Sequence, residues 1–426
     1  MTDAPTLSKL DTRNFITVDK YSPHQAAVLV DQKLEKSLIY NGNTFYEWND
    51  YYWQPVPEIV IDRLSIALLD KWTRTKHSDF LKLLQVYCYQ EININPFVVH
   101  LENFVFDLST FKLGQPLTYK YDYTIGHLPI TFEAGAEAPK WRAFLHEVMQ
   151  GNEDKIKLVQ EFFGYCFLGD NRYQQALVLL GAGNNGKSVL LEILSSLFDK
   201  VTYLDLKQIE DERYVHHIQG AWLNVASELQ YKSMETTAYI KAVIAGEVIQ
   251  AAPKYHKGFS FRPRAKIAFA TNGLPRNNDT SQGYFRRLLI INMAYSVKNP
   301  NRNIIEELKK EIPGIFNWAI EGLQRLMNRG SFKYENPYVE LYKEESSSLY
   351  AWWVEEGYNW MIEEQDGFLD ITFKDFYDKY TFYCGAGGMR PSGRNKLRSE
   401  LERLQIPVEM FIAKGNVKCV KLVASE

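Results

Sequence analysis

Apolar and polar positions follow a different pattern in the middle of the chain from that at its two ends. Between residues 171 and 300, short apolar runs alternate with amphipathic segments, which predicts strands and helices in a mostly parallel sheet. The expected strands occupy residues 176–180, 221–228, 266–272 and 288–292. Because parallel strands end at one edge of a sheet, we expect the active residues to lie at that edge.

Residues 1–170 show a mixed α/β pattern that leads directly into the first of these strands. Asn41-Gly42 signals a hairpin, helical periodicity runs from 57 to 72, and amphipathic helices are expected near 139–150 and 153–168. The hairpin is accompanied by five clustered aromatic residues: Tyr46, Trp48, Tyr51, Tyr52 and Trp53. This cluster is either core packing, which the pattern favours, or a platform on which bases stack.

Residues 335–426 form a third region that resembles a winged-helix module. A helix is expected over 373–383, and a second helix is expected to open at Pro391, followed by a hairpin of 408–412 and 417–422. The candidates for contacts to duplex phosphates are Arg390, Arg394, Lys396 and Arg398. Glu400 and Glu402 reduce the net positive charge of this patch, so docking of another protein remains the alternative function.

The composition is that of an ordinary folded protein, with 46% hydrophobic and 14% aromatic residues and a formal net charge of −3. Any contact with nucleic acid must therefore come from local clusters of lysine and arginine. The four cysteines lie far apart without metal-ligand spacing, which argues against a zinc site or disulfides and favours a reducing cytoplasm. We expect no secretion signal and no membrane span, because no sufficiently long apolar run occurs.

The strand at 176–180 runs straight into the motif Gly-x4-Gly-Lys-Ser, residues 181–188, and then into an amphipathic helix. Glycines allow successive backbone N–H groups to converge on phosphate oxygens, and the helix adds its positive dipole end. The expected phosphate cradle comprises Gly181, Gly183, Asn184, Asn185, Gly186, Lys187 and Ser188. In it, Lys187 reaches the β- and γ-phosphates of a nucleotide and Ser188 offers a hydroxyl to Mg²⁺.

Two polar residues close the strands that follow the cradle. Glu228 ends the run 221–228, where a carboxylate can orient Mg²⁺ and polarise the attacking water. Asn272 ends the run 266–272, where an amide can bond the γ-phosphate or the water. Each residue alone would be ordinary, and their shared position downstream of one cradle is what makes them candidates.

Together, Gly-x4-Gly-Lys-Ser, Ala-Ser-Glu, Ala-Thr-Asn-Gly-Leu-Pro and Gly-Tyr-Phe-Arg-Arg resemble the superfamily 3 DNA helicases, in particular the poxvirus and phage primase-helicase branch of the AAA+ ATPases. The resemblance is specific for residues 176–293. It implies an AAA+ P-loop ATPase core at 171–330. With the N-terminal α/β extension at 1–170 and the winged-helix-like domain at 335–426, the expected fold class is α/β. One departure is Ser227-Glu228, where many members have two acids, so the hydrolytic role falls to Glu228 alone.

The resemblance also implies an arginine finger and a ring. Arg286 and Arg287 follow the last motif, and one of them, with Arg286 favoured, would neutralise charge at the nucleotide of a neighbouring subunit. The pattern of residues 249–261 predicts a hairpin with a cationic turn. The resemblance places this hairpin in the channel of a hexamer. Lys254, His256 and Lys257 are the candidates there for contacts to DNA phosphates, with a solvated basic turn as the alternative.

These features predict an ATP- and Mg²⁺-dependent replicative helicase of a phage, prophage or other mobile element, moving on single-stranded DNA at forks. A metal-binding acid cluster for primer synthesis is not evident, so any cognate primase or polymerase is expected as a separate partner. The alternative function is an ATP-gated initiator that binds an origin without translocating.

Overall fold

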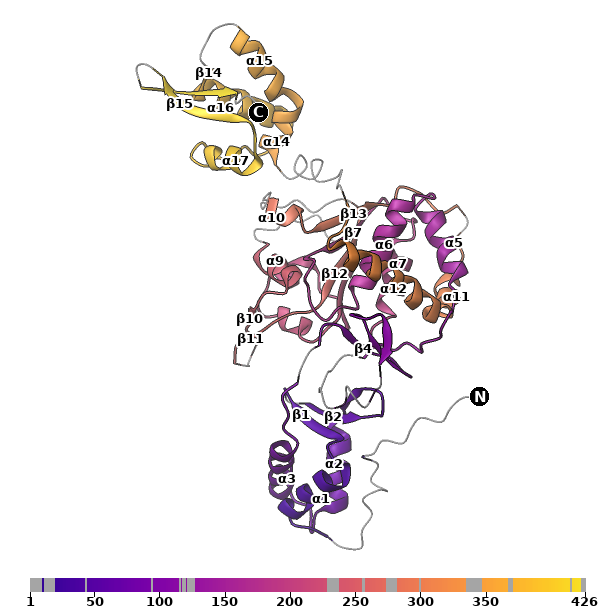
Figure 1. Ribbon diagram of the computed structural model, residues 1–426. Helices are drawn as coiled ribbons and strands as arrows, with labels where there is room; N and C mark the ends of the chain where they lie inside the picture. The colour runs from indigo at the N-terminus through magenta and orange to yellow at the C-terminus, as the bar shows by residue number, and fades with distance from the viewer. Residues whose placement is uncertain are drawn as a thin grey trace.

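The structure of the protein is a computed structural model. It describes residue 10 and residues 20–42, 44–92, 95–114, 116, 120, 127–227, 237–254, 257–272, 282–298, 300–334, 347–366, 371–413 and 416–422. Three parts follow one another along the molecule, namely an N-terminal lobe, a central core and a C-terminal domain (Figure 1). In these described residues, no helix is both long and apolar enough to cross a membrane.

The N-terminal lobe packs three helices against a small antiparallel sheet of order β1-β2-β3. Its elements are α1 (Pro23–Leu34), β1 (Leu38–Asn41), β2 (Thr44–Trp48), β3 (Trp53–Val56), α2 (Glu58–Leu68) and α3 (Arg74–Tyr87). The predicted hairpin at Asn41-Gly42 is confirmed, since Asn41 pairs with Thr44 and Gly42 has a φ of 53°. Trp48 and Trp53 are buried and their rings meet edge to face, so these two aromatics serve as core.

The central core is built around five parallel strands in the order β13-β7-β12-β9-β8. The strands are β7 (Ala176–Leu180), β8 (Val201–Thr202), β9 (Leu223–Ser227), β12 (Lys266–Thr271) and β13 (Leu288–Asn292). The four runs expected from the sequence are therefore confirmed as neighbours in one parallel sheet. The sequence does not predict β8, because two residues carry no readable period.

Helices cover both faces of this sheet, and β7 shows why. Leu177 and Leu179 point into one core with α5, α6, α7 and α12, whereas Ala176 and Val178 point into another with α9. The core helices are α5 (Pro139–Val148), α6 (Glu153–Tyr165), α7 (Lys187–Ser195), α8 (Leu206–Ile209), α9 (Ala238–Ala245), α10 (Gln282–Phe285), α11 (Ile304–Lys309) and α12 (Ile312–Arg329), with the 3₁₀ turn η2 (Val215–Ile218). Two further antiparallel sheets are β4 (Val98–His100), β5 (Val105–Asp107) and β6 (Lys112–Gly114), and β10 (Ile249–Ala251) with β11 (Phe259–Phe261).

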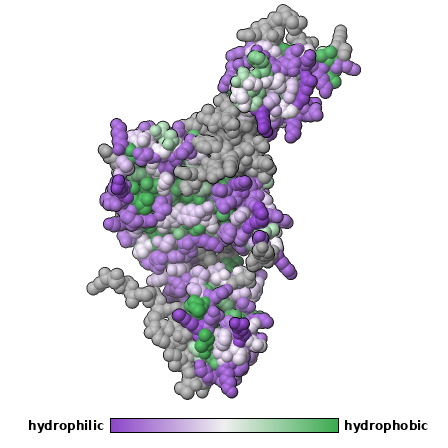
Figure 2. Space-filling view, turned by 180° about the vertical axis from the view of Figure 1, so that it is seen from behind, coloured by the Kyte–Doolittle hydropathy of each residue, from purple (hydrophilic) through white to green (hydrophobic). Residues whose placement is uncertain are grey.

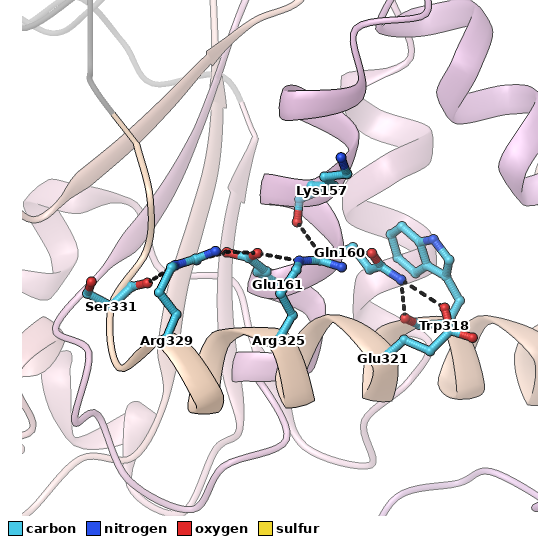
Figure 3. A network of polar contacts seen from close by, with 8 residues as sticks. All are labelled: Lys157, Gln160, Glu161, Trp318, Glu321, Arg325, Arg329 and Ser331. Carbon is cyan, nitrogen blue, oxygen red and sulfur yellow. Dashed lines mark hydrogen bonds and ion pairs between the residues drawn. The ribbon is translucent and has the colours of Figure 1, made fainter.

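The helices α6 and α12 lie unusually close together. A Cβ on Gly164 would sit 2.4 Å from the carbonyl oxygen of Ala319, and a Cβ on Gly322 would sit 2.4 Å from that of Gln160. Glu161, only 4% exposed, accepts hydrogen bonds from Arg325 Nε at 2.7 Å and from both terminal nitrogens of Arg329 (Figure 3). The packing therefore joins α5 and α6, upstream of the expected boundary at residue 170, to the same core as the sheet.

The C-terminal domain has its own hydrophobic core and an antiparallel sheet of order β14-β16-β15. Its elements are α14 (Ser348–Trp352), the π-helical η3 (Trp353–Gly357), α15 (Tyr358–Asp366), β14 (Ile371–Thr372), α16 (Phe373–Ala386), α17 (Leu397–Leu404), β15 (Val408–Ala413) and β16 (Val417–Leu422). The second helix begins at Leu397 and not at Pro391. Hydrogen bonds of Ser392 to the hydroxyls of Tyr377 and Tyr380 hold the preceding segment in an irregular conformation.

Candidate functional site: the phosphate cradle

The loop after β7 has the backbone shape that the motif predicts. Gly183, Asn184 and Gly186 have φ values of 109°, 49° and 84°, and α7 begins immediately afterwards at Lys187. Two of these left-handed positions are glycines, which adopt this region without strain. The strand, the loop and the helix therefore direct the first N–H groups of α7 and those of the loop toward one place.

Surrounding elements fix this loop on two sides. A Cβ on Gly186 would lie 2.8 Å from Val148 Cγ1 and 3.0 Å from Phe144 Cζ, so α5 packs directly against the cradle backbone. Asn185 Nδ2 donates to the carbonyl of Met293 at 2.7 Å, and Asn184 Nδ2 donates to the carbonyl of Val297 at 2.9 Å. The segment after β13 thus supports the loop, a role for the two asparagines that the motif alone does not predict.

Lys187 is buried, and its ammonium group lies within the loop. Nζ donates to the carbonyl of Gly181 at 2.6 Å and to Oδ1 of Asn185 at 2.8 Å. Ser188, in the first turn of α7, is exposed. A convergent backbone, a buried ammonium and an accessible hydroxyl fit a nucleotide triphosphate with its magnesium ion.

Asn272, one of the two residues expected beside the cradle, lies at the same edge of the sheet as the cradle. β12 runs parallel to β7, with Thr271 opposite Leu180, so the exposed Asn272 follows directly at that edge. β9 runs parallel to β12 on the other side, with Ser227 opposite Ala270. Glu228 comes next in the chain and lies outside the described residues.

Arg286 and Arg287 lie at the opposite edge of the sheet from the cradle. They precede β13, whose first residue pairs with Ala176, the first residue of β7. A strand of five residues spans about 15 Å, so neither arginine reaches its own cradle from this position.

The two arginines also differ in surroundings. Arg287 is buried and donates to the carbonyl of Gly283 and, at 3.5 Å, to Oε1 of Gln174. Burial lowers the pKa of Arg287, and the neighbouring charge of Arg286 lowers it further. The side chain of Arg286 is exposed, so it is the one available to another subunit.

The predicted hairpin is confirmed as β10 paired antiparallel with β11, with Ile249 opposite Phe261. It projects from the side of the core (Figure 1). Lys254 and Lys257 are exposed in its turn, and His256 lies outside the described residues. The cationic turn is therefore held away from the sheet on two short strands.

Two buried cations at the far end of β12 have no signature in the sequence. Lys266 donates to the carbonyls of Leu168 and Arg264, and Arg264 lies 4.0 Å from the ring of Trp222. Burial lowers the pKa of Lys266 to about 7 and that of Arg264 to about 10. Both lie at the opposite end of β12 from the cradle, so they support the fold rather than the cradle. The described residues contain no group of three or more His, Cys, Asp or Glu that could hold a metal ion.

Residues 179–287, which include the cradle, match a protein family described as a family of unknown function, DUF5906. The chain is also 27% identical over 254 residues to a protein of Acanthamoeba polyphaga mimivirus named "Putative helicase L207/L206". This alignment covers 54% of the chain and 25% of the mimivirus protein, so the chain spans about a quarter of that relative.

Solved structures of the NrS-1 C-terminal region share the fold. The A form of the apo structure gives a TM-score of 0.56 at 10% identity, covering 95% of this chain and 100% of the other. The A form of residues 305–718 gives a TM-score of 0.53 at 11% identity with the same coverage. The chain therefore has the fold of that region and is similar in sequence to a viral protein named as a helicase.

Proposed function

We propose that this chain is an ATP-hydrolysing DNA helicase of the superfamily 3 type, with an AAA+ core and a winged-helix-like C-terminal domain. In this proposal it works as a hexameric ring on single-stranded and forked DNA during replication of a virus, prophage or other mobile element. The similarity to a mimivirus protein named as a helicase supports the class of activity.

One observation carries the proposal of a ring. The exposed Arg286 lies at the sheet edge opposite the cradle, so it does not reach the cradle of its own chain. A neighbouring subunit related by rotation would bring its Arg286 to this cradle and complete it. Such an arginine stabilises charge that develops on the transferred phosphoryl group, worth roughly 10³–10⁵ in rate.

Phosphate binding, metal binding and activation of water are divided among the residues of the cradle and those beside it. The loop N–H groups and Lys187 bind and orient the phosphates of ATP, and Asn272 and Glu228 orient the attacking water. Mg²⁺, held by Ser188 and Glu228, would neutralise phosphate charge when bound. Lys254, His256 and Lys257 would hold DNA phosphates through charge alone, so movement would not depend on base sequence.

Mixing two inactive variants tests the shared site. Lys187→Ala removes the cradle cation and Arg286→Ala removes the finger, so each protein alone is expected to lose ATP hydrolysis. When they are mixed, an intact cradle meets an intact arginine at about one interface in four, which should restore roughly a quarter of the wild-type rate. The double variant mixed with Arg286→Ala offers one intact cradle and no finger, so it serves as the inactive control. A mixture no faster than its components would contradict the proposal.

A further inference from the structure

The C-terminal domain carries a groove on the side of its hairpin. Twelve of the described residues, from three separate parts of the sequence, line it, and its volume is about 740 Å³. The lining residues come from the start of α16, from the residues around the start of α17, and from β15 and β16. The described surface is otherwise largely hydrophilic in the view of Figure 2, with apolar side chains in small separate patches.

The groove is lined by cations from all three parts. They are Lys374 at the start of α16, Arg394 and Arg398 around the start of α17, and Lys418 on β16. None of the twelve lining residues is acidic. Arg394 and Arg398 belong to the patch noted in the sequence, whereas Lys374 and Lys418 join them only through folding.

The two arginines are held but not neutralised. The guanidinium of Arg394 lies 5.2 Å from the ring centre of Tyr377 and 5.8 Å from that of Phe373, and these rings position the charge without an acidic partner among the described residues. Arg398 pairs with Glu402 at 3.2 Å, but the side chains are 72% and 69% exposed, so this pair contributes little and exchanges readily. Asp375, beside Lys374, is engaged by the hydroxyl of Thr372 at 2.6 Å.

The lining favours a double-stranded over a single-stranded ligand. Proteins that bind single strands stack unpaired bases on exposed aromatic rings. Here Phe373 lies beneath Arg394, and Phe411 has the ammonium of Lys421 5.6 Å from its ring. The large apolar groups exposed at the groove are aliphatic, Ile412 and Val417. Cations from all three parts of the lining, with a cation beside each of the two lining aromatic rings, suit the phosphate backbone of a duplex.

We propose that this groove is a second nucleic-acid site that binds the phosphate backbone of duplex DNA, separate from the β10–β11 hairpin. Lys374, Arg394, Arg398 and Lys418 contact phosphates, and the contact is independent of base sequence. In the context of the proposed function, this site would hold the duplex part of a fork. Binding itself requires no ATP hydrolysis.

The test compares two double variants of the full chain that remove equal charge from the same domain. Lys374→Ala/Lys418→Ala removes one lining cation at the start of α16 and one on β16, and both side chains are exposed. Arg390→Ala/Lys396→Ala removes two exposed cations outside it. Binding of a labelled duplex is measured by fluorescence anisotropy without nucleotide, between about 50 and 200 mM salt, with a single strand of equal length as a second probe.

Removing one cation that binds a phosphate should lower the dependence of log affinity on log salt by about 1. We therefore expect the duplex slope to fall by about 2 in the groove variant and by less than half of that in the matched control, with little change for the single strand. Equal reductions in both variants, or a reduction confined to the single strand, would overturn the proposal. Unchanged duplex binding in the groove variant would also overturn it and leave an acidic protein segment as the occupant. Because nucleotide is absent, a failed ATPase proposal would not alter these outcomes.

Discussion

The cradle and the β10–β11 hairpin are both proposed to meet phosphates, yet they are built in opposite ways. The cradle backbone is fixed between α5, β12 and the segment after β13, and Lys187 is buried inside it. The hairpin pairs three residues on each strand and exposes Lys254 and Lys257. In the proposed function, the cradle would therefore recognise phosphate through backbone shape, whereas the hairpin would offer side-chain charge.

This difference shows how one chain can treat the same chemical group in two ways. A site shaped by the backbone in a packed core holds one phosphate chain in one geometry, as catalysis requires. A flexible, exposed charge accepts any phosphate of a polymer and releases it readily, as translocation requires. Changes in packing should thus affect the cradle, and changes in charge or salt should affect the hairpin.

The largest effect is expected from a single methyl group in the cradle. Gly186→Ala would be strained at a φ of 84° and would also overlap Val148, at a combined cost of roughly 2–5 kcal/mol. Gly183→Ala, at a φ of 109°, has open space around its Cβ and would carry the strain alone. ATP binding and hydrolysis should therefore fall much further for Gly186→Ala. If the two variants behaved alike, packing against α5 would not matter to the cradle.

The next effect concerns the packing of α6 against α12, two helices that share a hydrophobic core with α5. Glu161→Ala removes the shared acceptor of Arg325 and Arg329, and we expect the free energy of unfolding to fall by about 2 kcal/mol. Arg325→Ala leaves Arg329 on the carboxylate and should cost about 1 kcal/mol. Urea denaturation measures both values. A larger loss for Arg325→Ala would contradict the central position of Glu161 in this network.

A smaller effect is expected from the hairpin charges. Lys254→Ala and Lys257→Ala should each reduce the salt dependence of single-stranded DNA binding by about 1 in the logarithmic slope. Lys207→Ala, which removes an exposed lysine on α8 and not in the hairpin, is the matched control. Filter binding at several salt concentrations measures the slopes. Equal slopes for all three variants and the wild type would exclude the hairpin as a phosphate contact.

The smallest effect is a dependence of stability on pH. It arises away from the cradle and the hairpin, where the N-terminal lobe meets the central core. His100 Nδ1 donates to the carbonyl of Tyr51 at 2.8 Å, and burial lowers the pKa of His100 to about 4. The unfolded chain then binds more protons between about pH 4 and 6.5, so stability falls as the pH drops through this window and is unaffected above it. From about pH 7 to 6 the expected loss is about 1 kcal/mol or less. Urea denaturation of His100→Gln should show a weaker pH dependence than the wild type, and identical profiles would contradict this assignment.

The sequence predicts the sheet well because its strands are buried on both faces and read as continuous apolar runs. The runs at 176–180 and 288–292 match β7 and β13 to the residue. The start of α17 differs from the expected one, because the bonds of Ser392 to two tyrosine hydroxyls form only in the folded domain. Local signals do not contain such contacts.

The candidate sites also contain features that the sequence predicts and features that form only on folding. The cradle residues are contiguous in the sequence, so the motif predicts their arrangement. The tie from Asn185 to Met293 and the meeting of Lys374 with Lys418 join residues far apart in the chain, and neither has a local signature. The different settings of Arg286 and Arg287 likewise depend on Gln174, which approaches only through the sheet.

Strand displacement on a forked DNA substrate tests the proposed function most directly. The wild-type chain should separate the strands only with ATP and Mg²⁺, and Lys187→Ala should bind the fork without separating it. Hydrolysis of ATP and tight binding of the fork by the wild type, with no strand released, would contradict a helicase and favour an initiator that binds without translocating.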